Sequence, residues 1–201
     1  MIKEFNILIT GVGGQGVILM SELLGNSAVK DGLRIRGSEV LGMAVRGGPV
    51  FSSIRMGSEV YGPLPPLGKC DIMVSLELSE ALRNITFLSK SSLVILNTAI
   101  LVPFTVSLGQ SKYPSLEVIL EKLNKASSQT IKLDANQLAK EAGNLLTANI
   151  VMLGALFGTE QLPIKVETVK ESIEERFPAK VVPVNFKAFD LGYKVCQQAF
   201  K

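Results

Sequence analysis

Four of the six residues from position 11 to position 16 are glycines, in the order Gly-Val-Gly-Gly-Gln-Gly. Gly11, Gly13 and Gly16 fit the pattern Gly-x-Gly-x-x-Gly, in which glycines permit a tight turn and let the backbone approach a ligand. A helix that starts after such a turn presents free N–H groups, and these bind anions. The motif therefore predicts an anion or phosphate site formed by Gly11, Gly13, Gly14, Gln15 and Gly16. A purely structural use of the glycines, to let a helix lie close to its strand, stays open.

Two ordinary nucleotide-binding motifs do not fit the residues around this turn. The acidic residue expected about 20 positions further on to hold a ribose is missing, because Arg36 stands there and Glu39 comes three positions later. A P-loop is excluded because Val17 and Ile18, rather than Lys and Ser or Thr, follow Gly16. Ordinary NAD binding is therefore disfavoured, and no side chain is placed to reach a terminal phosphate or its magnesium ion.

A second glycine-rich segment, residues 37–49, carries Arg46 directly before Gly47 and Gly48. Backbone comes close to a ligand at glycines, and a guanidinium binds a phosphate or a carboxylate through paired hydrogen bonds. Arg46, Gly47 and Gly48 are therefore candidate binding residues. The alternative is a tight turn with a solvated arginine, since glycine often marks turns.

The periodicity of apolar residues predicts the elements that must position these two segments. Short apolar runs indicate strands at 5–10, 33–36, 50–56, 71–76, 92–96 and 130–133. Apolar residues at helical spacing predict helices at 17–30, 77–88, 116–125, 135–142, 148–157, 165–177 and 185–200. Strands and helices alternate through most of the chain, and its last part is helical.

This alternation predicts an α/β fold, namely a three-layer sandwich with a largely parallel, Rossmann-like open sheet and a helical C-terminal part. We expect residues 1–201 to form one domain, because a chain of this length can bury a core of its own. Ligands on such sheets bind at the carboxyl ends of the strands. Both glycine-rich segments follow strands, so they should meet at that edge. The apolar helix at 148–157 is expected to pack in the core or against a partner rather than to bind a ligand.

Asn97 and Asn149 are two further polar residues that could orient a ligand. Asn97 ends a predicted strand, where an asparagine can equally well serve to turn the chain. Both residues therefore stay secondary candidates.

Composition narrows the classes of partner. Lys and Arg number 21 against 18 Asp and Glu, and no dense basic run occurs, so nucleic-acid binding is not expected. Charged residues make up only 19% of the chain, which favours a protein partner or a homodimer of the isolated chain. The apolar region 93–108 is broken by Asn97, Thr98 and Pro103, so we expect no membrane span. The first residues lack the pattern of a signal peptide, so we expect a cytoplasmic protein.

The chain contains no histidine and only two cysteines, Cys70 and Cys196, which are far apart in the sequence. Histidine is the commonest general base near neutral pH and a common zinc ligand. An iron–sulfur cluster is ordinarily held by four protein ligands, mostly cysteines. We therefore expect no catalytic residue, no metal site and no cluster in this chain.

Short motifs are spread over most of the chain. They are Gly-Val-Gly-Gly-Gln-Gly at 11–16, Ser-Glu-Val at 38–40, Gly-Met-Ala at 42–44, Arg-Gly-Gly at 46–48 and Ala-Asn-Ile-Val-Met-Leu-Gly-Ala-Leu at 148–156. Together they resemble the gamma-type subunit of 2-oxoacid:ferredoxin oxidoreductases. Gly-Pro-Leu at 62–64, Glu-Ala-Leu-Arg at 80–83 and Val-Asn-Phe-Lys-Ala-Phe at 184–189 are similar to the beta subunit of indolepyruvate ferredoxin oxidoreductase within that family. The resemblance adds Ser38, Glu39 and Met43 to the candidate binding residues.

The resemblance implies an accessory subunit of a complex that oxidatively decarboxylates a 2-oxoacid, such as indolepyruvate or another aryl-pyruvate, to an acyl-CoA. It implies that thiamine diphosphate, magnesium and iron–sulfur clusters lie in a larger partner subunit, which also passes electrons to ferredoxin. This chain lacks the Gly-Asp-Gly and Asn-Asn sequences that would bind thiamine diphosphate, which agrees with that division. Its glycine-rich segments would then cover the partner's active site, with coenzyme A as a candidate contact.

Two positions depart from the pattern of the family. Relatives commonly carry a histidine where Leu41 stands and a glutamine where Val45 stands, so a different substrate is compatible with this sequence. Two other functions stay open as well. One is a stand-alone nucleotide-binding enzyme of the NAD or adenylating type, and the other is a purely structural docking subunit.

Overall fold

The computed structural model describes residues 2–42, 46–101, 106 and 112–200. Its strands are β1 (Phe5–Val12), β2 (Ile35–Leu41), β3 (Pro49–Met56), β4 (Ile72–Ser75), β5 (Leu93–Asn97) and β6 (Gln129–Leu133). Its α-helices are α1 (Val17–Lys30), α2 (Leu78–Arg83), α4 (Leu116–Ala126), α5 (Ala135–Ala142), α6 (Ala148–Phe157), α7 (Val166–Arg176) and α8 (Val182–Ala199). Short 3-10 helices are η1 (Ile85–Phe87), η2 (Leu145–Thr147) and η3 (Ala179–Val181).

The strands form one sheet in the order β2-β3-β1-β4-β5-β6. The pairs β1/β4, β4/β5 and β5/β6 are parallel, whereas β1/β3 and β2/β3 are antiparallel. The predicted α/β fold with a largely parallel open sheet is therefore confirmed. Both faces of the central strands are covered, and this is why β1, β4 and β5 read as continuous apolar runs rather than as alternating ones.

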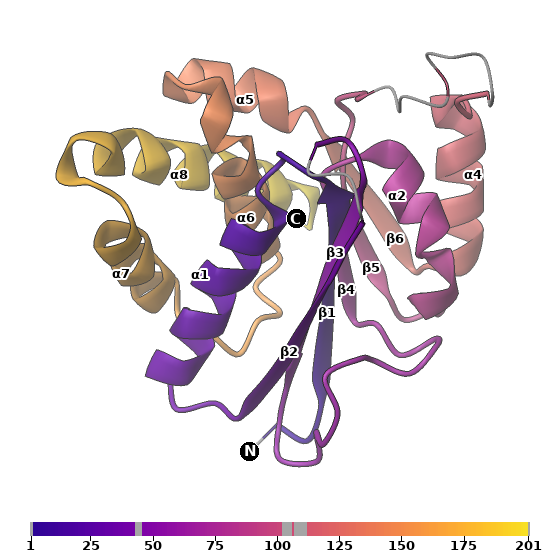
Figure 1. The fold of residues 1–201 in the computed structure, drawn as a ribbon, viewed down its shortest axis with the longest axis horizontal. Coiled ribbons are helices and arrows are strands. Elements are labelled where there is room, and N and C mark those ends of the chain that lie inside the picture. Colours follow the sequence, from indigo (N-terminus) through magenta and orange to yellow (C-terminus); the bar gives the residue numbers. More distant parts are fainter. Residues whose placement is uncertain (1, 43–45, 102–105, 107–111, 201) are drawn as a thin grey trace.

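Helices cover the two faces of the sheet unequally (Figure 1). Helices α1 and α5 to α8 lie on one face, and α2 and α4 lie on the other. Successive side chains of a strand point to opposite faces, so Ile7 and Ile9 of β1 join the first core whereas Leu8 joins the second. The three predicted layers result from this double packing.

The structure corrects the prediction for residues 33–49. A strand was expected at 33–36 followed by a loop from 37, but β2 extends to Leu41 and pairs along its whole length with β3. β2 is the edge strand, and five of its seven residues are exposed. Because this edge strand buries so few residues, its sequence contains no apolar run that would mark its end. The end of β2 is set by its pairing with β3.

Two helix boundaries also differ from the prediction. The helix expected at 77–88 is the short α2 followed by η1, because Asn84 ends α2 and its Nδ2 donates to the Glu80 carbonyl at 2.9 Å. Helix α8 begins at Val182 rather than at 185 and carries Pro183 in its first turn. The first N–H groups of a helix have no partner within the helix, so proline costs little there.

The helix at 148–157 is confirmed as core. Nine of the ten residues of α6 are buried, and its neighbours are α8, α5, α1 and the sheet. Across the described residues, no helix combines the length and apolar composition needed to cross a membrane.

Candidate functional site

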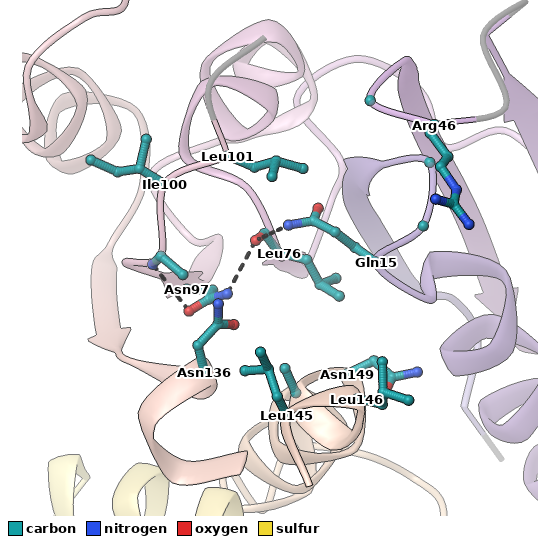
Figure 2. Close-up of a pocket in the computed structure, with 15 residues that line it drawn as sticks. Gln15, Arg46, Leu76, Asn97, Ile100, Leu101, Asn136, Leu145, Leu146 and Asn149 are labelled. Carbon is teal, nitrogen blue, oxygen red and sulfur yellow. Dashed lines mark hydrogen bonds between the residues drawn. The ribbon is translucent and has the colours of Figure 1, made fainter. Parts of the chain in front are cut away.

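A cavity of about 670 Å³ opens at the carboxyl edge of the sheet (Figure 2). Segments that are distant in the sequence meet around it: the turn between β1 and α1, the loop before β3, the ends of β4 and β5, and the starts of α5 and α6. The described lining residues are Gly13, Gly14, Gln15, Arg46, Gly47, Leu76, Asn97, Ala99, Ile100, Leu101, Asn136, Leu145, Leu146, Ala148 and Asn149.

The two glycine-rich segments are joined directly by backbone hydrogen bonds. The Gly13 N–H donates to the Gly48 carbonyl at 2.9 Å, and the Gly47 N–H donates to the Gly13 carbonyl at 3.1 Å. β1 and β2 both run antiparallel to β3, so their carboxyl ends reach the same edge. The prediction that both segments meet at one edge of the sheet is therefore confirmed.

The glycines of the first segment have different roles in the turn. A Cβ on Gly11, which lies inside β1, would come within 2.8 Å of the Gln15 Oε1. Gly16 has a φ of +82°, and a Cβ there would lie 2.3 Å from the Asn149 Nδ2. Gly14 has a φ of +98° with nothing within 4 Å of a Cβ, so its backbone faces open space. Gly11 and Gly16 thus serve close packing, whereas Gly13 and Gly14 present backbone to the cavity.

Replacement of Gly16 by alanine should lower the free energy of unfolding by about 1–3 kcal/mol from backbone strain at positive φ, and by more from the collision with Asn149. Urea denaturation followed by circular dichroism measures this loss. Gly32→Ala is the matched control, because Gly32 has a φ of +75° but nothing within 4 Å of its Cβ. Equal losses in the two variants would show that the contact with Asn149 adds nothing.

The start of α1 makes the cavity attractive to anions. α1, α5 and α6 begin at its wall, and α1 has no acidic residue in its first turn. α1 also lacks a side-chain cap, so no capping side chain satisfies its first N–H groups. α5 differs, because its N-cap Asp134 accepts the Gln137 N–H at 2.8 Å and its Ala135 N–H donates to the Asn97 Oδ1 at 3.0 Å. In α6, which continues from η2, the Ala148 N–H donates to the Leu145 carbonyl and the Ile150 N–H donates to the Asn149 Oδ1 at 3.0 Å. Helix N-termini carry a partial positive charge.

Charged side chains add to this bias. Arg46 is the one charged side chain among the described lining residues, and no carboxylate is among them. Arg46 and Asn136 lie on opposite sides of the cavity in Figure 2. A guanidinium and the uncapped start of α1, with no carboxylate among the described lining residues, are suited to a phosphate or carboxylate group of a ligand.

The structure brings together only part of the predicted site. Gly13, Gly14, Gln15, Arg46 and Gly47 line the cavity, while Gly11, Gly16 and Gly48 support them from behind.

Ser38 and Glu39 are not brought into this group. They lie in the edge strand β2, opposite Ser53 and Ser52 of β3, and are not among the lining residues. The family resemblance made them candidates through the motif Ser-Glu-Val at 38–40, and this motif lies within β2. Leu41 ends the same strand with its side chain exposed. Met43 and Val45 lie outside the described residues.

Sequence reasoning missed most of the far wall of the cavity. Asn97 and Asn149 were secondary candidates, but Asn136, the pair Ile100 and Leu101, and the pair Leu145 and Leu146 were not singled out. These side chains come from the segment after β5, from the start of α5 and from η2, the 3-10 helix before α6. The available signal was their position directly after predicted strands or before predicted helices, which is where α/β sheets bind ligands.

Groups elsewhere in the chain offer little reactive chemistry. Burial raises the pKa of the Cys70 thiol to about 12 and that of the Cys196 thiol to about 12, so neither is a thiolate near neutral pH. Nowhere in the described part of the chain do three or more His, Cys, Asp or Glu side chains gather closely enough to hold a metal ion. The described residues of the cavity wall can thus bind and orient a ligand, and none of them is a strong nucleophile or base.

Comparison with known proteins places this chain in a family. The family described as pyruvate ferredoxin/flavodoxin oxidoreductase matches residues 6–195. The indolepyruvate oxidoreductase subunit IorB of Pyrococcus horikoshii is 46% identical over 200 residues, which cover 98% of each chain.

Solved structures share the fold. The gamma subunit of a keto/oxoacid ferredoxin oxidoreductase from Geobacter sulfurreducens superimposes with a TM-score of 0.70 at 24% identity, covering 96% of this chain and 99% of that one. A 2-oxoglutarate:ferredoxin oxidoreductase from Magnetococcus marinus superimposes with a TM-score of 0.76 at 20% identity, covering 98% of this chain but 32% of that longer one. On the extent of the family match and the near full-length identity to IorB, this chain belongs to the pyruvate ferredoxin/flavodoxin oxidoreductase family.

Proposed function

We propose that this chain is the accessory subunit of an indolepyruvate-type 2-oxoacid ferredoxin oxidoreductase. The observation that carries the proposal is the 46% identity, over 98% of both chains, to a protein named as a subunit of indolepyruvate oxidoreductase. A cavity whose described lining residues include no strong base or nucleophile is what an accessory subunit would have. In the reaction, a 2-oxoacid loses carbon dioxide, its acyl group is transferred to the sulfur of coenzyme A, and two electrons pass to ferredoxin.

The redox and decarboxylation groups would belong to a larger partner subunit. An iron–sulfur cluster ordinarily takes four protein ligands, but this sequence has only two cysteines, and both are buried. The chain has no histidine and no thiamine-binding sequence, so its residues do not fit thiamine diphosphate, magnesium or a cluster. These groups, and the contact with ferredoxin, are therefore assigned to the partner.

The carboxyl edge of the sheet would face the partner's active site. There, the Gly13 and Gly14 backbone, the start of α1 and Arg46 would hold an anionic group, either a phosphate of coenzyme A or the carboxylate of the 2-oxoacid. The exposed Ile100, Leu101, Leu145 and Leu146 around the same cavity support contact with an apolar surface of the partner.

The reading as a stand-alone nucleotide-binding enzyme has less support. A ribose hydroxyl is commonly held by a carboxylate, and an adenylating site needs a carboxylate for magnesium. No Asp or Glu is among the described residues that line the cavity. A purely structural docking role would leave the cavity without a ligand, and the activity of cavity variants separates it from the proposal.

Anaerobic reconstitution tests the proposal. The chain and its large partner subunit are purified separately, mixed, and assayed for ferredoxin reduction with indolepyruvate, pyruvate and 2-oxoglutarate. We expect each subunit alone to be inactive and the complex to be active, with indolepyruvate preferred. Turnover of any of these substrates by the 201-residue chain alone would contradict the proposal. Micromolar binding of NAD, NADP or ATP to it in calorimetry would favour the nucleotide-binding enzyme instead.

A further inference from the structure

The carbonyl group of Leu76, just beyond β4, is held by two side-chain amides at the centre of the cavity wall (Figure 2). The Gln15 Nε2 donates to this oxygen at 3.0 Å, and the Asn97 Nδ2 donates to it at 3.2 Å. Gln15 comes from the glycine turn and Asn97 from the end of β5. The two amides therefore tie three neighbouring strand ends together at one backbone atom.

The other end of each amide holds further backbone groups. The Gln15 Oε1 accepts the Val12 N–H at 2.9 Å, which closes the glycine turn onto the end of β1. The Asn97 Oδ1 accepts the Ala99 N–H at 3.2 Å and the Ala135 N–H at 3.0 Å. Ala135 is the first residue of α5, so Asn97 fixes both the segment after β5 and the start of that helix.

Burial and saturation argue against a direct ligand contact by Asn97. The residue is 2% exposed, and both polar atoms of its side chain are engaged with backbone groups. Breaking these bonds to reach a ligand would leave buried N–H and C=O groups unsatisfied, which is unfavourable. A saturated, buried amide is suited to holding a wall in place.

We infer that Asn97, together with Gln15, is a positioning residue that sets the width of the cavity. Asn97 holds Ile100 and Asn136 at a fixed separation from the glycine turn, through Ala99 on one side and Ala135 on the other. This part of the inference rests on the proposed function, because the ligand whose binding Asn97 would affect is the anionic substrate of the complex. The hydrogen bonds that join the glycine turn, the ends of β4 and β5 and the start of α5 are part of the fold, so their contribution to stability can be tested whether or not the proposed function is correct.

A double-mutant cycle in the full chain tests the shared carbonyl. Asn97→Ala and Gln15→Ala each leave Leu76 one amide donor, and the double variant leaves it neither. The double variant should therefore lose more stability in urea denaturation than the sum of the singles. We expect an excess of about fivefold in the unfolding equilibrium constant, typical of groups in one hydrogen-bond network. Additive losses would overturn the inference.

Steady-state kinetics of the reconstituted complex test the positioning role. The KM values for coenzyme A and for the 2-oxoacid are both measured, and Asn97→Ala should raise one of them by about tenfold while kcat changes less than about threefold, as expected when binding alone is weakened. Gln15→Ala should show the same split, and decides the question if Asn97→Ala does not fold. Unchanged KM values for both substrates in a folded variant would overturn the role.

Asn84→Ala is the matched control. Asn84 is also a buried asparagine whose Nδ2 donates to a backbone carbonyl, at 2.9 Å from the Glu80 oxygen, but it does not line the cavity. Its KM should stay at the wild-type value, and an equal rise there would assign the effect to general loss of stability and overturn the inference. If the wild-type complex had no 2-oxoacid activity, the proposed function would be wrong. The double-mutant cycle in urea denaturation would still show whether the two amides are coupled.

Discussion

Replacement of Gly154 by alanine should lower the free energy of unfolding by at least ~3 kcal/mol, out of the ~5–15 kcal/mol that holds a typical domain folded. Gly154 lies in α6, where a Cβ would come within 2.0 Å of the Phe189 carbonyl oxygen in α8. A backbone atom cannot rotate away as a side chain can, so the two helices would have to separate. Gly192 makes the reciprocal approach, with its Cβ position 1.9 Å from the Val151 oxygen, and Gly192→Ala should have a similar effect.

Urea denaturation and thermal melting followed by circular dichroism measure this loss. Gly25→Ala is the control, because Gly25 lies inside α1 and its Cβ would meet only the Ile35 Cδ1 at 3.6 Å, an ordinary contact. Since alanine is favoured over glycine in a helix interior, Gly25→Ala should be neutral or stabilise the chain by up to ~1 kcal/mol. A Gly154→Ala variant as stable as Gly25→Ala would show that α6 and α8 can move apart at little cost.

The second large effect is expected in catalysis, from Arg46→Ala in the reconstituted complex. Arg46 is the one charged residue among the described residues of the cavity wall, and it is exposed. Loss of a charge-assisted hydrogen bond to an anion costs ~1.5–3 kcal/mol, so kcat/KM should fall about 10- to 100-fold. The melting temperature should stay close to that of the wild type, because an exposed side chain contributes little to the core.

Arg46→Lys and Arg36→Ala complete this experiment. Lysine keeps the charge without the planar pair of donors, so Arg46→Lys should retain an intermediate kcat/KM. Arg36 is also exposed, but it lies in β2 and does not line the cavity, so Arg36→Ala should keep full activity. Full activity of Arg46→Ala would leave the chain with a docking role only.

Local patterns were enough to predict many elements of this protein. The helices α1, α5 and α6 begin and end at the predicted residues, because apolar spacing, caps and terminal glycines act within one or two turns of the chain. The glycine turn at 11–16 and its position between a buried strand and a helix were predicted for the same reason. The lack of histidine and of a cluster-forming set of cysteines was also a property of the sequence alone.

Only the tertiary structure decided which residues share the site. The pairing of β2 with β3 placed Ser38 and Glu39 in an edge strand away from the cavity, and the ends of β4 and β5 brought Leu76 and Asn97 beside the glycine turn. The close crossing of α6 and α8 gave Gly154 its role. Strand pairing, strand order and helix crossing depend on contacts between residues far apart in the chain. No local pattern of residue types carries that information, because the same pattern is compatible with several such arrangements.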